Sequence, residues 1–205
     1  MSDEATDAVE RPTYAAGIAA ACEAAKLAHS TSQRMKLAAQ YLKVECIEVA
    51  PGVVALAAGA TTAARELDLA TTVFRGVAMQ ALSLAALTQH VPVGEVEPVI
   101  APAIADADAV GNPVGLILAD IVDLVDVEAG AIRLVESFDD VVAVLGDSLA
   151  RIAHLEAIAA EVDRIIFGGS GVLASRMELL ALSISGRLRV LEDMTVKLIE
   201  VAGAE

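Results

Sequence analysis

The apolar positions in the C-terminal third of the chain follow a helical repeat more strictly than those anywhere else. They recur every three or four residues over two stretches, which the glycine-rich residues 167–171 separate. This is heptad spacing, in which two apolar positions in seven form a seam along one side of a helix. Ser137, followed by Asp139 and Asp140, predicts the N-cap of the first helix. The short glycine-rich turn favours an antiparallel hairpin.

We expect the seam of this hairpin to be an assembly seam, buried by a helix of the same chain or of a second copy. Its apolar residues are Leu145, Ile152, Leu155, Val162 and Ile166 before the turn, and Met177, Leu180, Ile184, Leu191 and Leu198 after it. The charged residues of both stretches, Asp163 among them, fall largely off the seam and predict a solvated outer side.

An alanine-rich pattern fills residues 12–90 and predicts a second helical hairpin. Pro12 suits a first helical turn, and a Pro-Gly pair at residues 51–52 divides the pattern. The polar residues 29–32 (His-Ser-Thr-Ser) interrupt the first half and predict a kink or a short loop there.

The second half of this region carries small residues at every fourth position. They are Ala55, Gly59 and Ala63. Small residues in such a row let another helix backbone come close. The sequence therefore predicts a close-packing seam along this helix.

Residues 91–114 contain four prolines, a density that excludes a long helix. We expect a flexible acidic tail at residues 1–11 and an Ala-rich helical hairpin at residues 12–90. A Pro/Gly-rich connector at residues 91–114 and a heptad helical region at residues 115–205 should follow. The expected fold class is all-α: an elongated helical bundle with a C-terminal, coiled-coil-like antiparallel heptad hairpin and a Pro-rich central connector.

Composition strengthens the helical prediction and argues against several functions. The chain is 56% hydrophobic and only 2% aromatic, and 42 of its 205 residues are alanine. Alanine is the best helix former, whereas binding pockets and recognition hot spots rely on aromatic side chains. The net charge of −15 argues against nucleic acid and against anionic membrane surfaces. We expect no catalytic residues and no nucleic-acid partner.

Candidate metal and cofactor sites are weak. The three histidines lie far apart in the sequence, without the spacing of a di-iron or zinc motif. Residues 106–112 match a calcium loop at its first, third and sixth positions, but Val110 and Ile117 stand where ligands are needed. We expect no metal and no cofactor.

Two uncharged stretches, residues 49–64 and 76–94, raise the question of a membrane. Both contain glycine or proline and are only mildly hydrophobic, so no constitutive span is predicted. The acidic N-terminus differs from the basic start of a signal peptide. This predicts a cytoplasmic protein, a part of an assembled particle, or a protein exported by a signal-peptide-independent route.

The leading hypothesis is a non-catalytic, self-associating helical structural protein. It would be a subunit of a homo-oligomer or of a larger filament, particle or tail-like assembly, with a second copy as partner. The first alternative is a conditionally membrane-active protein, pore-forming or membrane-remodelling, that uses the two uncharged stretches. The second alternative is a bundle that binds a small ligand or a metal in its core.

Overall fold

The structure, a computed structural model, describes residues 14–46, 52–88 and 135–202. These ranges contain four helices and no strand: α1 (Tyr14–Val44), α2 (Val53–Thr88), α5 (Phe138–Ile166) and α6 (Val172–Ala202). The predicted all-α helical bundle is confirmed. The acidic tail and the Pro/Gly-rich connector of the sequence prediction lie outside the described residues.

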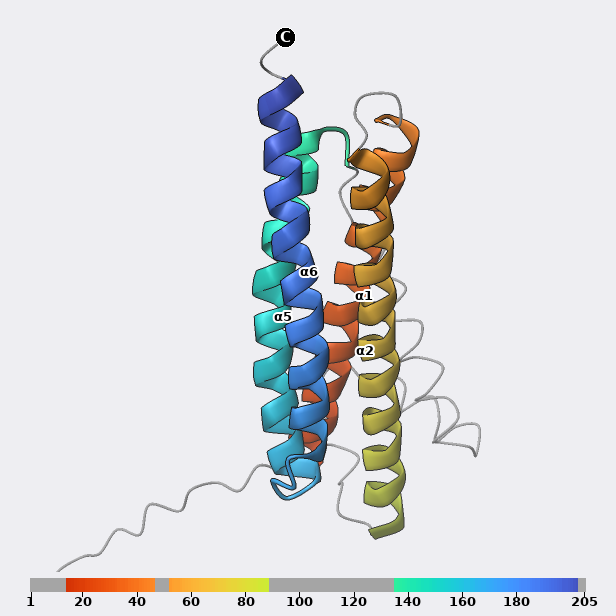
Figure 1. Cartoon of the computed structure of the whole chain (residues 1–205). Helices are drawn as coiled ribbons and strands as arrows, with labels where there is room; N and C mark the ends of the chain where they lie inside the picture. The colour runs from red at the N-terminus through yellow and green to blue at the C-terminus, as the bar shows by residue number, and fades with distance from the viewer. Residues whose placement is uncertain (1–13, 47–51, 89–134, 203–205) are drawn as a thin grey trace, which may run out of the picture.

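The four helices form an elongated bundle in which neighbours run antiparallel (Figure 1). α1 packs on α2 and α5, and α6 packs on α5 and α2. Tyr41, late in α1, meets the ring of Phe138 at the start of α5, whereas Gly17, early in α1, meets Ile166 at the end of α5. α2 ends and α5 begins at opposite ends of the bundle. The bundle therefore consists of two antiparallel hairpins laid side by side.

The two hairpins bury different kinds of side chain. The contact between α1 and α2 is the most extensive of the bundle. Its buried residues are mostly alanines, which let two helices approach closely. They include Ala21, Ala24, Ala25, Ala28, Ala38, Ala57, Ala60, Ala63, Ala64 and Ala78. The hairpin of α5 and α6 instead buries mainly leucine, isoleucine, valine and methionine.

α1 continues without a break through residues 29–32, so the predicted kink or loop is wrong. Thr31 and Ser32 are fully buried. The Thr31 hydroxyl donates to the Leu27 carbonyl at 2.6 Å, and the Ser32 hydroxyl lies 2.9 Å from the Ala64 carbonyl of α2. The Ser32 hydroxyl thus finds an acceptor on α2, and the Thr31 hydroxyl bonds back to a carbonyl of its own helix, so both are satisfied without interrupting α1.

The hairpin of α5 and α6 turns where the sequence predicts, at three glycines with positive φ, Gly168, Gly169 and Gly171. Asp163 of α5, predicted on the solvated side, is buried instead. Its carboxylate accepts the backbone N–H of Gly171 at 2.7 Å and that of Leu173 at 2.9 Å. The first N–H groups of a helix have no partner within the helix. Asp163 therefore caps α6 from the preceding helix, which explains its burial.

Candidate functional site

The structure places the predicted assembly seam inside the chain's own core. Leu180 and Leu198 are partly buried and pack against that core, and the other eight residues are buried. They are Leu145, Ile152, Leu155, Val162, Ile166, Met177, Ile184 and Leu191. Since the helices of one copy already cover this seam, a second copy of the folded bundle has to meet a different surface.

The predicted close-packing seam on α2 is only partly brought together. Ala63 is buried, and a Cβ atom added to Gly59 would lie 2.6 Å from a methyl carbon of Leu191 on α6. Ala55, however, is exposed. A row of every fourth residue drifts around a helix by about 40° per step, since each residue turns it by about 100°. The buried row of α2 instead uses mixed steps of three and four, through residues such as Leu56 and Ala60.

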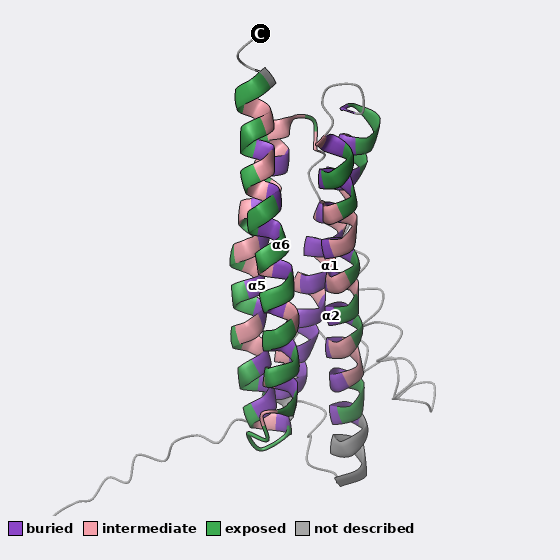
Figure 2. Ribbon diagram, in the orientation of Figure 1, coloured by how far each residue is buried: buried purple, intermediate pink, exposed green. Residues whose placement is uncertain are grey.

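Among the described residues, the largest concentration of exposed aliphatic side chains lies on the outer side of α6. Its members, here called the α6 outer row, are Val172, Leu179, Leu182, Val190 and Val201, each between 58% and 71% exposed. At about 100° per residue they fall within an arc of about 100°. Figure 2 shows exposed residues recurring along the length of α6. Single exposed aliphatic residues are ordinary, but an exposed row is typical of an interaction surface.

Charged residues interrupt and flank this row. Asp193 and Lys197 separate Val190 from Val201. Towards the start of the helix the row is flanked by Arg176, and towards its end by Asp193 and Glu200, all three exposed. Charges of both signs therefore lie along the outer side of α6, with Arg176 and Glu178 towards its start and Asp193, Lys197 and Glu200 towards its end.

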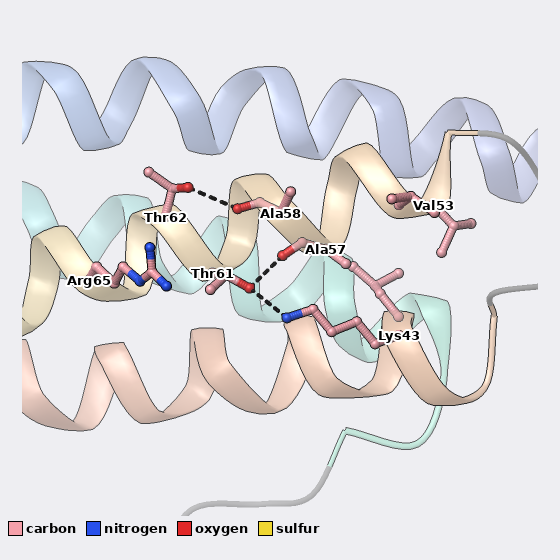
Figure 3. Close-up of a pocket in the computed structure, with 9 residues that line it drawn as sticks. Lys43, Val53, Ala57, Ala58, Thr61, Thr62 and Arg65 are labelled. Atoms are coloured by element: carbon pink, nitrogen blue, oxygen red, sulfur yellow. Dashed lines mark hydrogen bonds between the residues drawn. The ribbon is translucent and has the colours of Figure 1, made fainter.

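A hollow of about 370 Å³ lies between the end of α1 and the start of α2 (Figure 3). The Lys43 ammonium donates to the Thr61 hydroxyl at 3.1 Å, and this hydroxyl donates to the Ala57 carbonyl at 2.7 Å. The Thr62 hydroxyl donates to the Ala58 carbonyl at 2.9 Å. The hydroxyl protons are thus held by the helix itself. Neither hydroxyl is paired with a general base that would make it a nucleophile.

A second hollow, of about 450 Å³, lies between α2 and the turn that precedes α6. Its apolar lining residues include Leu69, Val73 and Phe167. Val172 and Arg176 of α6 also line it, so it adjoins the N-terminal end of the α6 outer row. This hollow extends the exposed apolar surface from α6 towards α2.

The thiols are poor candidates for chemistry. Cys22 and Cys46 are free and buried. Burial raises the pKa of the Cys22 thiol to about 11. The pKa of Cys46 is also raised, first by burial. Since the thiolate is the nucleophile and the metal ligand, both residues are held in their unreactive form. Among the described residues, no three His, Cys, Asp or Glu side chains are grouped so that they could hold a metal ion.

No protein-family model, curated protein or solved structure matches the chain. In the three described ranges, no helix combines the length and the apolar character needed to cross a membrane. The feature of the described residues that points to a function is the surface of the bundle, above all the α6 outer row. The sequence does not single out this row, because α6 carries aliphatic residues on two sides and the heptad spacing follows the inner side.

Proposed function

We propose that the protein is a non-catalytic, self-associating helical building block whose copies meet through the α6 outer row. The observation that carries this proposal is the exposure of five aliphatic side chains along one side of one helix. The inner seam of the same helix is already used within the chain. In the described part of the chain, the outer row is thus the most extended apolar surface left for a second copy.

The expected strength of this association follows from the burial it would provide. Complete burial of a valine or leucine side chain stabilises by about 1.5–3 kcal/mol, and these side chains are already partly covered. Two rows of five residues then contribute on the order of 10–20 kcal/mol. Lost translational and rotational freedom costs roughly 4–15 kcal/mol. Because the two amounts are of similar size, we expect an association that depends on protein concentration and is reversed by dilution.

Sedimentation equilibrium from low micromolar to high micromolar concentration tests the proposal. The wild-type protein should show a concentration-dependent mass above that of the 21.0 kDa monomer. Val190→Glu should weaken association at least tenfold, because a carboxylate would have to lose its water in the contact. A wild-type chain that stays monomeric throughout the range would rule the proposal out.

Val54→Glu is the matched control for this experiment. Val54 is an equally exposed valine, at 61% against 58% for Val190, and lies on α2 away from the row. It should leave both association and helix content unchanged. Equal weakening by the two variants would mean that added negative charge, rather than the α6 outer row, controls association.

The competing hypothesis of conditional membrane activity requires a change in the structure. The most apolar residues of α2, such as Leu56, Phe74 and Leu82, are buried in the core. They could reach lipid only if α2 left the bundle. Leakage of a dye from liposomes at neutral and acidic pH separates the hypotheses, because the self-association proposal expects none.

A further inference from the structure

One side of α1 faces neither of the two described helices that pack on it, α2 and α5. Lys36 of α1 pairs with Asp68 of α2, and the Ser30 hydroxyl accepts a hydrogen bond from Arg151 of α5 at 3.2 Å. At about 100° per residue, Lys36 and Ser30 lie about 120° apart around the helix. The core occupies the wider arc between them, and the narrower arc is here called the outer side of α1. Between positions 19 and 37 it carries Ala19, Cys22, Lys26, His29, Gln33 and Leu37.

This outer side is covered over the middle of the helix. Cys22 is only 3% exposed, and the other five residues are half-buried. Gln40 and Val44, further along the same side, are exposed. On the outer side of α6, where none of the described helices packs, exposed residues recur on every turn (Figure 2). A contact other than those with α2 and α5 therefore covers α1 between residues 19 and 37.

The chain between α2 and α5 can reach this side. α2 ends at Thr88, and the described chain resumes at Val135 near the opposite end of the bundle (Figure 1). Val135 lines a hollow of about 170 Å³ together with Leu37 and Val44, so the chain rejoins the bundle beside the outer side of α1. A helix as long as α5, with 29 residues, spans about 43 Å. Residues 89–134 are more than long enough to cover that distance, because an extended chain spans about 3.3 Å per residue.

The charges of residues 89–134 suit the outer side of α1. They include eight acidic residues and a single Lys or Arg, Arg133. The outer side carries Lys26 and His29 and no acid. The nearest acid of α1, Glu23, lies just beyond this arc towards α5, and no further acid follows it in the helix. Complementary charges favour this contact and disfavour contacts between like charges.

We propose that residues 89–134 pack along the outer side of α1 as a third neighbour of this helix. They supply acids for Lys26 and aliphatic residues, such as Ile121 and Leu124, for the apolar part of this side. The inference concerns contacts within one chain, so it does not depend on the proposed self-association.

Photo-cross-linking of the full chain tests this contact. The photoreactive residue p-benzoylphenylalanine replaces Gln33, in the middle of the outer side, and the dilute protein is irradiated, digested and analysed by mass spectrometry. The linked peptide should come from residues 89–134. In an equal mixture of chains with and without ¹⁵N, both halves of the linked peptide should carry the same isotope. The same photoreactive residue at Leu179, which is exposed on α6, is the control and should give no link to residues 89–134.

Three results of this experiment would overturn the proposal. A linked peptide from residues 1–13 would show that the acidic tail covers α1. A link between unlike isotopes would assign the cover to a second copy of the chain. A Gln33 variant without any link would show that the middle of α1 faces water.

Neutral variants test the role of charge with a smaller change at the reporter position. In a Gln33→Cys background, labelling of the new thiol by maleimide is followed by mass spectrometry, which separates it from the native cysteines. Labelling should become several-fold faster when four acids of the segment are neutralised, because the contact with α1 is weakened. The changes are Asp120→Asn, Asp123→Asn, Asp126→Asn and Glu128→Gln.

A charge-matched variant is the control for this measurement. It neutralises four exposed acids of α5 and α6 through Glu161→Gln, Glu178→Gln, Asp193→Asn and Glu200→Gln. It should leave the labelling rate of Gln33→Cys unchanged, and both variants should keep the helix content seen by circular dichroism. Equal acceleration in the two variants, or none in either, would contradict a contact held by the acids of residues 89–134.

Discussion

Asp163 shows how one buried charge fixes the turn between two helices. Its carboxylate accepts two backbone N–H groups near the start of α6, and its backbone carbonyl accepts those of Phe167 and Gly169. Three glycines with positive φ let the chain bring these groups together. Position in the heptad could not predict this role, because the partners of the carboxylate are backbone groups eight and ten residues away.

We expect Asp163→Ala to lower the free energy of unfolding by about 2–3 kcal/mol, because hydrogen bonds to a charged group contribute about 1.5–3 kcal/mol and the first N–H groups of α6 lose their cap. Urea unfolding followed by circular dichroism measures the change. Glu161→Ala is the control, since Glu161 pairs with Arg164 on the exposed side of α5 and such pairs contribute little. Equal losses in the two variants would contradict the capping role.

Cys22 makes the stability of the bundle sensitive to alkaline pH. Burial raises the pKa of its thiol from 9.0 to about 11. Between these values the unfolded chain loses a proton that the folded chain keeps, so rising pH favours the unfolded state. The Cys22 thiol adds its full contribution to stability below pH 9 and loses it as the pH rises towards 11.

Comparison with Cys22→Ala isolates this effect from the titration of lysines and tyrosines. The wild-type protein should be more stable than the variant at pH 8, because Ala leaves a small cavity. This advantage should shrink by about 1 kcal/mol between pH 8 and pH 10. Urea unfolding under reducing conditions at the two pH values checks it. A difference that is constant with pH would contradict the buried neutral thiol.

The helices themselves were largely predictable from the sequence. The heptad stretches correspond to α5 and α6, and Ser137 caps α5 by accepting the Asp140 N–H, as expected. The kink or loop predicted at residues 29–32 was wrong because a run of polar residues can form either a loop or a buried contact between helices. Only the partner helix distinguishes them, since Ser32 finds its acceptors, the Ala64 carbonyl and the Asp68 carboxylate, on α2.

Replacing a helical glycine by alanine should lower the stability of the bundle at one position and raise it at another, depending on the atoms that surround the glycine. A Cβ atom at Gly17 would lie 2.8 Å from Ile166 and 2.9 Å from Ile165, two β-branched side chains with little freedom to move. We expect Gly17→Ala to destabilise the bundle by about 1–3 kcal/mol. Gly186→Ala meets no atom and should stabilise the monomer by about 0.5–1 kcal/mol. Urea unfolding, at a protein concentration too low for the copies to associate, measures both changes in stability. A gain in stability for Gly17→Ala would show that α1 and α5 are not in close contact there.

At the scale of the whole molecule, the sequence predicted the fold class but not the arrangement of the hairpins. Which helices are neighbours depends on pairs distant in sequence, such as Gly17 with Ile166 and Gly59 with Leu191, for which the chain carries no local signal. The candidate interaction surface was hidden for a related reason. Aliphatic residues on both sides of α6 leave open which side is the core until the neighbours of α6 are known.

Two substitutions two residues apart on α6 should separate folding from assembly. Ile184 is only 2% exposed in the core, so Ile184→Asp would bury an unpaired carboxylate and cost several kcal/mol. Its circular dichroism should show loss of helix at low concentration, where no oligomer is present.

Leu182 is 63% exposed in the α6 outer row. Leu182→Asp should keep the helix content and the melting temperature of the dilute protein, because surface changes usually alter stability by less than about 0.5 kcal/mol. It should nevertheless lose the concentration-dependent mass in sedimentation. If Leu182→Asp unfolds the dilute protein as Ile184→Asp does, the outer side of α6 belongs to the core and cannot serve as the surface of assembly.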